Sequence, residues 1–130
     1  MRDVNDRTLL MIAYWNNDVF DYLIKKPQDF SIVSLYGWNI IHHIVLYGNE
    51  KCESQLIKLS QKTNVESLIN KRNVNGDTPL HHAARKNKHR TIARLISMGS
   101  DVNVRNNLNK LPDEYDWCDD VTKRIIRQLR

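Results

Sequence analysis

The pattern of apolar and polar positions predicts a chain of short, paired helices. Residues 7–24 are expected to form two helices that turn near Asn16, followed by a loop and a hairpin-like turn over residues 34–38. A later helix is marked by an apolar stripe that closes at a glycine: Ile92, Leu95, Ile96 and Gly99. The chain therefore looks helical from end to end, with turns between the helices.

One motif recurs along the chain. Residues 76–84 read Gly-Asp-Thr-Pro-Leu-His-His-Ala-Ala, and residues 37–44 repeat the glycine and the His-His pair. Residues 8–13 match residues 78–83, and Pro112 follows Pro79 by one period. The motif resembles the T-P-L-H-x-A signature of the ankyrin-repeat family. The resemblance implies a single domain, an all-α solenoid of about four helix-turn-helix units with degenerate ends. The expected units are residues 3–33, 34–72, 73–105 and 106–130.

Residue types around the motif agree with this architecture. Thr78 is expected to cap a helix through its hydroxyl, and Pro79 suits the first turn, where a missing N–H costs nothing. Gly76 allows the positive φ of a tight turn. Asn87 and Gly48 stand where first helices end, and both residue types tolerate the left-handed conformation.

The second unit is longer than the others. The spacing from Gly37 to Gly76 exceeds the 33-residue ankyrin period by about six residues. The surplus falls near Thr63. Apolar residues there, Val65, Leu68 and Ile69, recur at near-helical spacing, which predicts an extra helical turn.

The composition of the chain indicates the cellular compartment in which it is expected. No apolar run reaches the length of a membrane span, and residues 1–6 are too polar for a signal peptide. Cys52 and Cys118 fall in different units, which favours a reducing compartment over a disulfide framework. We expect a monomer in the cytoplasm or also in the nucleus, those of the host cell if the chain is viral or bacterial.

The net charge of +5 introduces binding of nucleic acid or another polyanion as an alternative. Basic residues cluster in residues 85–94 and 123–130. No recognised nucleic-acid motif accompanies them, so cations that cover exposed helix faces are the favoured explanation. A structural segment of a larger scaffold is a further alternative.

The two His-His pairs suggest zinc at first sight. Adjacent residues on a helix diverge by about 100°, so a pair does not converge easily on one ion. The family resemblance implies that His42 and His81 bond to the backbone of a hairpin, and we expect His43 and His82 to fill space between helices. Because no catalytic, cofactor or metal motif is present either, a non-enzymatic chain without cofactors is expected.

The acidic residues of the fourth unit replace apolar positions of the repeat. Asp113, Glu114 and Asp116 are therefore expected to make one face of this unit wet. A polar outer face is typical of a terminal repeat.

The family resemblance also implies where a partner binds, namely at the hairpin tips and along the concave face of the first helices. The corresponding residues are Trp15, Tyr36, Trp38, Leu46, Tyr47, Val74, Asn75, Asp77, Arg85 and Lys86, with Leu108 in the fourth unit. Their chemistry is aromatic in the first two units and basic in the third, and Trp, Tyr and Arg are enriched at interface hot spots. Such a groove suits a protein with apolar anchors followed by acidic residues. The alternative is that Trp15 and Trp38 pack as core or loop-stabilising residues.

A narrower resemblance concerns residues 67–78, which are similar to the viral inhibitor-of-NF-κB-like ankyrin proteins of polydnaviruses. It implies a Rel-type transcription factor as the partner and inhibition as the function. No degradation motif of the DSGxxS kind is present. A bacterial effector, a eukaryotic scaffold subunit and a piece of a larger array remain alternatives.

One modification is also implied by resemblance. The spacing from Leu95 to Asn103 is similar to that of ankyrin asparagines hydroxylated by the cellular asparaginyl hydroxylase. Asn103 is therefore a candidate for hydroxylation, with hydrogen bonding within the hairpin turn as the alternative role.

Overall fold

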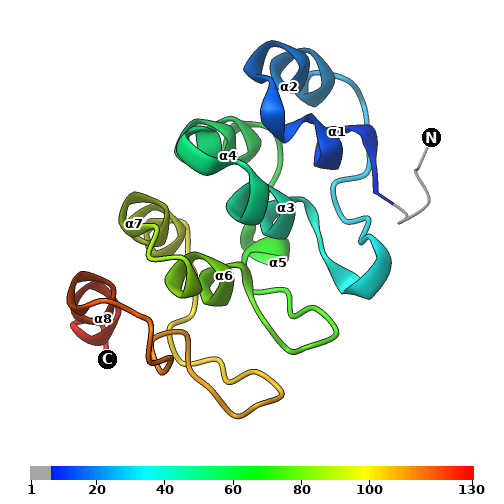
Figure 1. Ribbon diagram of the computed structural model, residues 1–130. Coiled ribbons are helices and arrows are strands. Elements are labelled where there is room, and N and C mark those ends of the chain that lie inside the picture. Colours follow the sequence, from blue (N-terminus) through cyan, green and yellow to red (C-terminus); the bar gives the residue numbers. More distant parts are fainter. Residues whose placement is uncertain (1–6) are drawn as a thin grey trace.

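The computed structural model describes residues 7–130, which form a stack of helix pairs joined by turns (Figure 1). No β-strand occurs in this range. The α-helices are α1 (Leu9–Ile12), α2 (Asn17–Ile24), α3 (Ile40–Tyr47), α4 (Cys52–Lys62), α5 (Glu66–Ile69), α6 (Pro79–Arg85), α7 (His89–Ser97) and α8 (Asp120–Arg127). Short 3₁₀ helices are η1 (Ala13–Trp15), η2 (Leu35–Gly37) and η3 (Asn49–Lys51).

The helices lie in two rows. Figure 1 shows α1, α3 and α6 in one row and α2, α4, α7 and α8 in the other, with the hairpin turns beside the first row. Fully buried side chains of both rows form a core along the stack, and they include Phe20, Ile41, Ile44, Leu56, Leu80, Ile92, Leu95 and Ile126. The predicted all-α solenoid is confirmed.

The first helix of each central unit begins with a hydrogen bond from the backbone N–H of its N-cap to the ring of a histidine three residues later. At the start of α3, His42 N donates to Asn39 Oδ1 at 3.0 Å, and Asn39 N donates to His42 Nδ1 at 3.1 Å. At the start of α6, Thr78 is the N-cap and its backbone N donates to His81 Nδ1 at 3.1 Å. These bonds satisfy N–H groups that the helix leaves without partners. Thr78 is the N-cap residue and Pro79 lies in the first turn, as predicted, but the Thr78 hydroxyl lies 2.9 Å from the His81 ring and His81 N donates to the backbone carbonyl of Thr78.

The same two histidines join each unit to the next. Because Nδ1 accepts a hydrogen bond, Nε2 carries the ring proton and donates it. His42 Nε2 lies 3.0 Å from Asp77 O, and His81 Nε2 lies 3.0 Å from Lys110 O. Both acceptors belong to the hairpin of the following unit. The predicted structural role of His42 and His81 is confirmed.

Special backbone conformations mark the turns. Gly76 (φ +75°) and Asn87 (φ +53°) adopt the left-handed conformation, as predicted. Gly48 does not, since its φ is −70°. A Cβ at Gly48 would lie 2.5 Å from Ile44 O and 2.9 Å from Cys52 Sγ. The prediction for Gly48 is wrong: the glycine is required by close packing, not by a positive φ.

The surplus in the second unit is helical, as predicted. Helix α4 has 11 residues whereas α7, its counterpart in the third unit, has 9. The additional helix α5 follows, and it buries Leu68 and Ile69. Asn39 Nδ2 donates to Leu68 O at 2.8 Å, which ties this insertion to the start of α3.

The fourth unit departs from the helix-turn-helix expectation. Turns replace the first helix between residues 111 and 119, although Pro112 aligns with Pro79. Helix α8 is the α-helix of residues 106–130, and Asp119 caps it by accepting from Thr122 N at 2.8 Å. The last pair of helices is thus reduced to one helix over a folded turn.

The carboxylate of Asp113 is buried in this unit, with the residue 1% exposed. It accepts hydrogen bonds from Arg127 Nε at 2.8 Å and Arg130 Nη2 at 2.6 Å. Burial alone would raise the pKa of Asp113, but the bonds from the two arginines outweigh it and hold the pKa below its ordinary value. The predicted wet face is therefore wrong for Asp113, while Glu114 and Asp116 are exposed.

Replacement of Gly76 by alanine should destabilise the fold far more than the same change at Gly99. Both glycines have positive φ, but a Cβ at Gly76 would lie 2.6 Å from Asn107 Oδ1 and 2.7 Å from Asn107 N, while Gly99 has open space. We expect losses of about 2–5 kcal/mol for Gly76→Ala and about 1–2 kcal/mol for Gly99→Ala in urea unfolding. Equal losses would show that contact with the fourth hairpin is not what restricts position 76.

The buried histidines predict that stability falls in mild acid. Burial lowers the pKa of His42 to about 4, and it lowers that of His82 as well, with the nearby His42 ring acting in the same direction. Both rings stay neutral in the folded chain, whereas unfolded histidines take up protons below about pH 6.5. Their contribution is complete above pH 6.5 and is lost as the pH falls toward 4. Each proton taken up on unfolding lowers the free energy of unfolding by about 1.4 kcal/mol per pH unit.

Urea titrations between pH 7.5 and pH 5 test this expectation. The matched variant is His42→Gln, because glutamine keeps a capping-box side chain and does not titrate in this range. The slope of its free energy of unfolding against pH should correspond to about one proton fewer taken up on unfolding. An unchanged slope would mean that His42 is not held neutral in the fold.

Candidate protein-binding site

Three hairpin turns stand in a row beside the first helices (Figure 1). We number them by unit as the second (residues 34–38), third (residues 73–77) and fourth (residues 106–110) hairpins. Val74 N donates to Tyr36 O and Asn107 N donates to Asn75 O, both at 2.9 Å, so each turn is bonded to the next. Each tip presents apolar side chains to solvent: Leu35 is 46% and Tyr36 64% exposed in one hairpin, and Val74 57% and Leu108 75% in the other two. The row is therefore both fixed in position and apolar at its outer edge.

A first groove lies between the second hairpin and α3. Its volume is about 320 Å³. Its lining combines three aromatic rings of Tyr and Trp with polar, basic and aliphatic side chains: Arg7, Ser34, Leu35, Tyr36, Trp38, His43 and Tyr47. We call this site the first groove.

Packed rings form the floor of the first groove. The Trp38 ring lies 5.2 Å from that of His82, 5.5 Å from His43 and 6.3 Å from Tyr47, measured between centroids. Tyr14 stacks on Tyr47 at 5.2 Å. The expectation that His43 and His82 fill space is confirmed, since both are buried in this cluster. Rings held this way lose little conformational entropy when a partner binds.

A second groove lies between the third and fourth hairpins and the end of α6. Its volume is about 440 Å³. The lining residues come from both tips and from the turns of the fourth unit: Asn75, Asp77, Arg85, Asn106, Asn107, Leu108, Tyr115 and Trp117. We call this site the second groove.

A hydrogen-bond network supports the second groove from below. Asp77 accepts from Arg85 Nη2 at 3.0 Å and from Asn106 Nδ2 at 2.8 Å, and Arg85 Nη2 also lies 3.0 Å from the Tyr115 hydroxyl. Burial alone would raise the pKa of Asp77, but the bonds from Asn106 and Arg85 outweigh it and hold the pKa below its ordinary value. Asp77 is only 3% exposed. Its expected place on the exposed surface is wrong, because both carboxylate oxygens are used inside the fold.

Two rings of the second groove were missed from the sequence. Trp117 is 57% exposed and stacks on Tyr115 at 5.1 Å, while Arg85 Cζ lies 4.9 Å from the centre of the Tyr115 ring. Tyr115 stands between Glu114 and Asp116, which suggested a wet face, and Trp117 directly follows them. The exposed tryptophan, judged as Trp15 was, could have drawn attention to this segment.

The other predicted residues lie at differing depths. Arg85 and Trp38 are half-buried, Leu46 is partly covered at the end of α3, and Asn75 and Lys86 are exposed. Trp15 is 61% exposed but lines neither groove. The structure thus gathers Tyr36, Trp38 and Tyr47 in the first groove and Asn75, Asp77 and Arg85 in the second. A role of these residues in binding stays a prediction.

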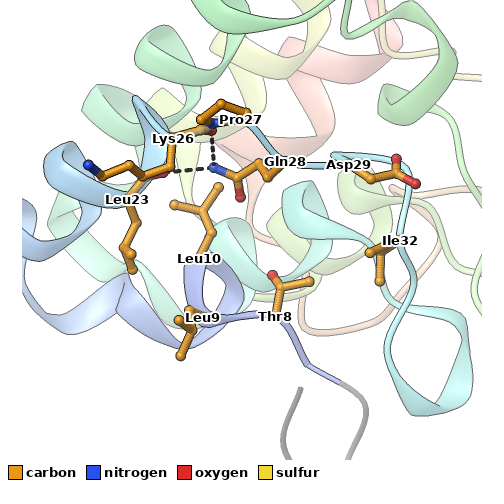
Figure 2. Close-up of a pocket in the computed structure, with 9 residues that line it drawn as sticks. All are labelled: Thr8, Leu9, Leu10, Leu23, Lys26, Pro27, Gln28, Asp29 and Ile32. Atoms are coloured by element: carbon orange, nitrogen blue, oxygen red, sulfur yellow. Dashed lines mark hydrogen bonds between the residues drawn. The ribbon is translucent and has the colours of Figure 1, made fainter. Parts of the chain in front are cut away.

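A third pocket, of about 360 Å³, lies at the other end of the stack. Figure 2 shows Leu9, Leu10, Leu23 and Ile32 around it, with the charged ends of Lys26 and Asp29 directed away. Gln28 Nε2 donates to Leu23 O at 2.7 Å and so holds the loop after α2 in place. None of the predicted partner-binding residues lines this pocket.

Titratable side chains outside the grooves give no sign of a metal centre in the part of the chain that the structure describes. Within residues 7–130, no three His, Cys, Asp or Glu side chains lie close enough together to hold an ion. Cys52 and Cys118 are buried free thiols. No helix of this range is long and apolar enough to cross a membrane.

Comparison with known proteins agrees with the fold. The family model "Ankyrin repeats (3 copies)" matches residues 9–106. The phosphocholine transferase AnkX of Legionella pneumophila is 27% identical over 113 residues, and a probable serine/threonine-protein kinase of Dictyostelium discoideum is 31% identical over 126 residues. These matches cover 85% and 87% of this chain, but only 12% of the length of either relative. The match to the family model and the stacked helix pairs show that the chain belongs to the ankyrin-repeat family.

Proposed function

We propose that this chain is a non-catalytic adaptor or inhibitor that binds a protein partner along its hairpin side. Ankyrin repeats are a protein-interaction fold, and the proposal specifies the surface. The observation that carries it is the pair of grooves on that side, each with an exposed aromatic ring held on a packed support. Interfaces concentrate their binding energy in such anchors.

The basic residues predicted from the sequence suit a partner that combines apolar anchors with acidic residues. Arg7 lines the first groove but already has an interaction within the protein. In the second groove Arg85 is balanced by the buried Asp77, while Lys86 stands exposed at the end of α6. Opposite potentials across an interface guide association and exclude partners of like charge.

The most specific partner suggested by the sequence is a Rel-type transcription factor, held by an inhibitor of viral or pathogen origin in the cytoplasm. This proposal rests on the resemblance of residues 67–78. That segment includes the last three residues of the insertion helix α5 and the third hairpin, whose Val74 tip is exposed. Direct titration with a purified Rel-type domain tests it, and a Kd above about 100 μM would remove this partner class.

The polyanion alternative receives less support from the structure. Several of the basic side chains in residues 85–130 bond to carboxylates: Arg85 to Asp77, Arg94 to Glu53, Arg105 to Glu114, and Arg127 and Arg130 to Asp113. A basic side chain that is already paired with a carboxylate is less available to bind a phosphate. Retention on immobilised nucleic acid that falls steeply between 50 and 200 mM salt, as multiple phosphate contacts require, would restore this alternative.

Alanine variants of the groove rings should weaken partner binding. We expect Tyr47→Ala and Trp117→Ala each to cost about 2 kcal/mol, or roughly a thirtyfold increase in Kd, because each removes an aromatic anchor. The partner is first captured on the immobilised chain from cells, identified by mass spectrometry and purified. Its affinity for each variant is then measured by calorimetry.

The matched control is Tyr22→Ala, since Tyr22 is 63% exposed on α2 and lines neither groove. This variant should bind the partner as the parent chain does. Circular dichroism checks that all variants stay folded. Loss of affinity in Tyr22→Ala with full affinity in both groove variants would place the interface elsewhere.

A further inference from the structure

The second groove contains N–H donors that the fold does not use. Arg85 makes both of its hydrogen bonds through Nη2, so its Nη1 and Nε groups have no acceptor within residues 7–130. In the same range, the indole N–H of Trp117 and the side-chain N–H groups of Asn75 also form no hydrogen bond. All three side chains line the groove and reach solvent. An occupant of the groove therefore meets donors that are free to bond.

The oxygen atoms of the same groove are mostly engaged within the fold. The two carboxylate oxygens of Asp77 accept hydrogen bonds from Arg85 and Asn106. The side-chain oxygens of Asn106 and Asn107 and the hydroxyl of Tyr115 also accept from other groups of the chain. The exposed amide of the Asn75 side chain is the exception within the described residues. The second groove thus offers more free donors than free acceptors.

The rest of the groove is apolar and carries no net charge. Trp117 is 57% and Leu108 75% exposed, and the Trp117 ring is supported from behind by the stacked ring of Tyr115. Arg85 is paired with Asp77 at 3.0 Å, and no other charged residue lines the groove. Its volume of about 440 Å³ lies within the range of ligand pockets. An uncharged, apolar segment fits these properties.

The excess of donors distinguishes between the backbone conformations that such a segment can have. A helix uses its carbonyl groups for its own hydrogen bonds, so few of them could accept from the groove. A β-strand brings an N–H group for nearly every carbonyl, and the groove has few acceptors for them. A polyproline II helix has no internal hydrogen bonds, and proline has no N–H. Proline-rich segments are also known to dock in grooves lined by aromatic rings.

We propose that the second groove binds a proline-rich segment of the partner in the polyproline II conformation. Proline rings pack on the exposed faces of Trp117 and Leu108, and backbone carbonyls accept hydrogen bonds from the free N–H groups of Trp117 and Arg85. The bonds of Arg85 to Asp77 and Tyr115 fix this surface before the segment arrives, which suits a ligand that is itself pre-ordered. This inference rests on the proposed function and names what the second groove takes.

Three nine-residue peptides test this chemistry by NMR titration of the full chain. They are nonaproline, the same peptide made of D-proline, which measures apolar adsorption, and a Ser-Gly peptide with a central Phe-Glu pair. Nonaproline should shift the indole N–H signal of Trp117 but not those of Trp15 and Trp38, with a Kd of about 1 mM or lower. It should bind at least about tenfold more tightly than either of the other peptides.

Three results of this titration would overturn the inference. They are the absence of a Trp117 shift at about 10 mM nonaproline, a preference of less than about tenfold over either comparison peptide, and a shift at Trp38 in place of Trp117. Tighter binding of the Phe-Glu peptide would assign the groove to an acidic segment instead.

The matched variants are Trp117→Ala and Trp15→Ala, because these tryptophans are 57% and 61% exposed and only Trp117 lines the groove. Binding is followed here by the backbone amide signals of Asn107 and Leu108. Trp117→Ala should weaken nonaproline binding at least about tenfold, while Trp15→Ala should leave it unchanged. Trp117→Phe keeps an aromatic face without the N–H and should weaken binding about fivefold. Parent-like affinity in Trp117→Ala or in Trp117→Phe would overturn the inference, and circular dichroism checks that each variant is folded.

The outcome can be separated from that of the proposed function. If the captured protein partner loses affinity in Trp117→Ala but nonaproline does not compete with it, the chain is a protein-binding module whose second groove takes another kind of segment. If nonaproline binds the groove and displaces the partner, both proposals stand. If nonaproline binds as expected but no protein partner is captured, the groove has the stated chemistry and the proposed function fails.

Discussion

Each central unit of this solenoid is joined to the next through one imidazole ring. The ring of His42 or His81 accepts a backbone N–H at the start of its own helix and donates to a backbone carbonyl of the following hairpin. Only the neutral ring does both. Burial keeps it neutral by lowering its pKa, so the helix start, the position of the next hairpin and the protonation state depend on one another.

The hydrogen bonds of His42 and His81 to the hairpins also determine the shape of the grooves. Because the hairpins are fixed to the helices behind them, their tips form a bonded row and leave two hollows beside it. Asp77 takes part in both the fold and the surface. Its backbone carbonyl accepts a hydrogen bond from His42, and its carboxylate accepts hydrogen bonds from Arg85 and Asn106 under the second groove. A binding surface built this way is rigid before a partner arrives, which lowers the entropic cost of association.

The fourth unit is built differently from the central units. The fourth unit has no neighbour beyond it in the described chain, and its core is covered by α8, a folded turn and the pairing of the buried Asp113 carboxylate with Arg127 and Arg130, which reach the surface. Loss of the two arginines would leave the Asp113 charge buried and unpaired, so their bonds to it stabilise this unit. The same turn brings Tyr115 and Trp117 to the second groove, which makes the terminal unit part of the surface as well as a cap.

The sequence by itself determined the repeat, the helices of its first three units, the N-cap position of Thr78, the joining role of His42 and His81 and the helical insertion after Thr63. Local signals of this kind arise from capping, turn chemistry and helical period, which act over a few residues. Only the tertiary structure decided that Gly48 serves close packing, that Asp77 and Asp113 are buried, and that Trp117 belongs beside Leu108 and Arg85. Those outcomes depend on contacts between residues far apart in the chain. Burial and pairing of a charge are properties of such contacts, not of local sequence.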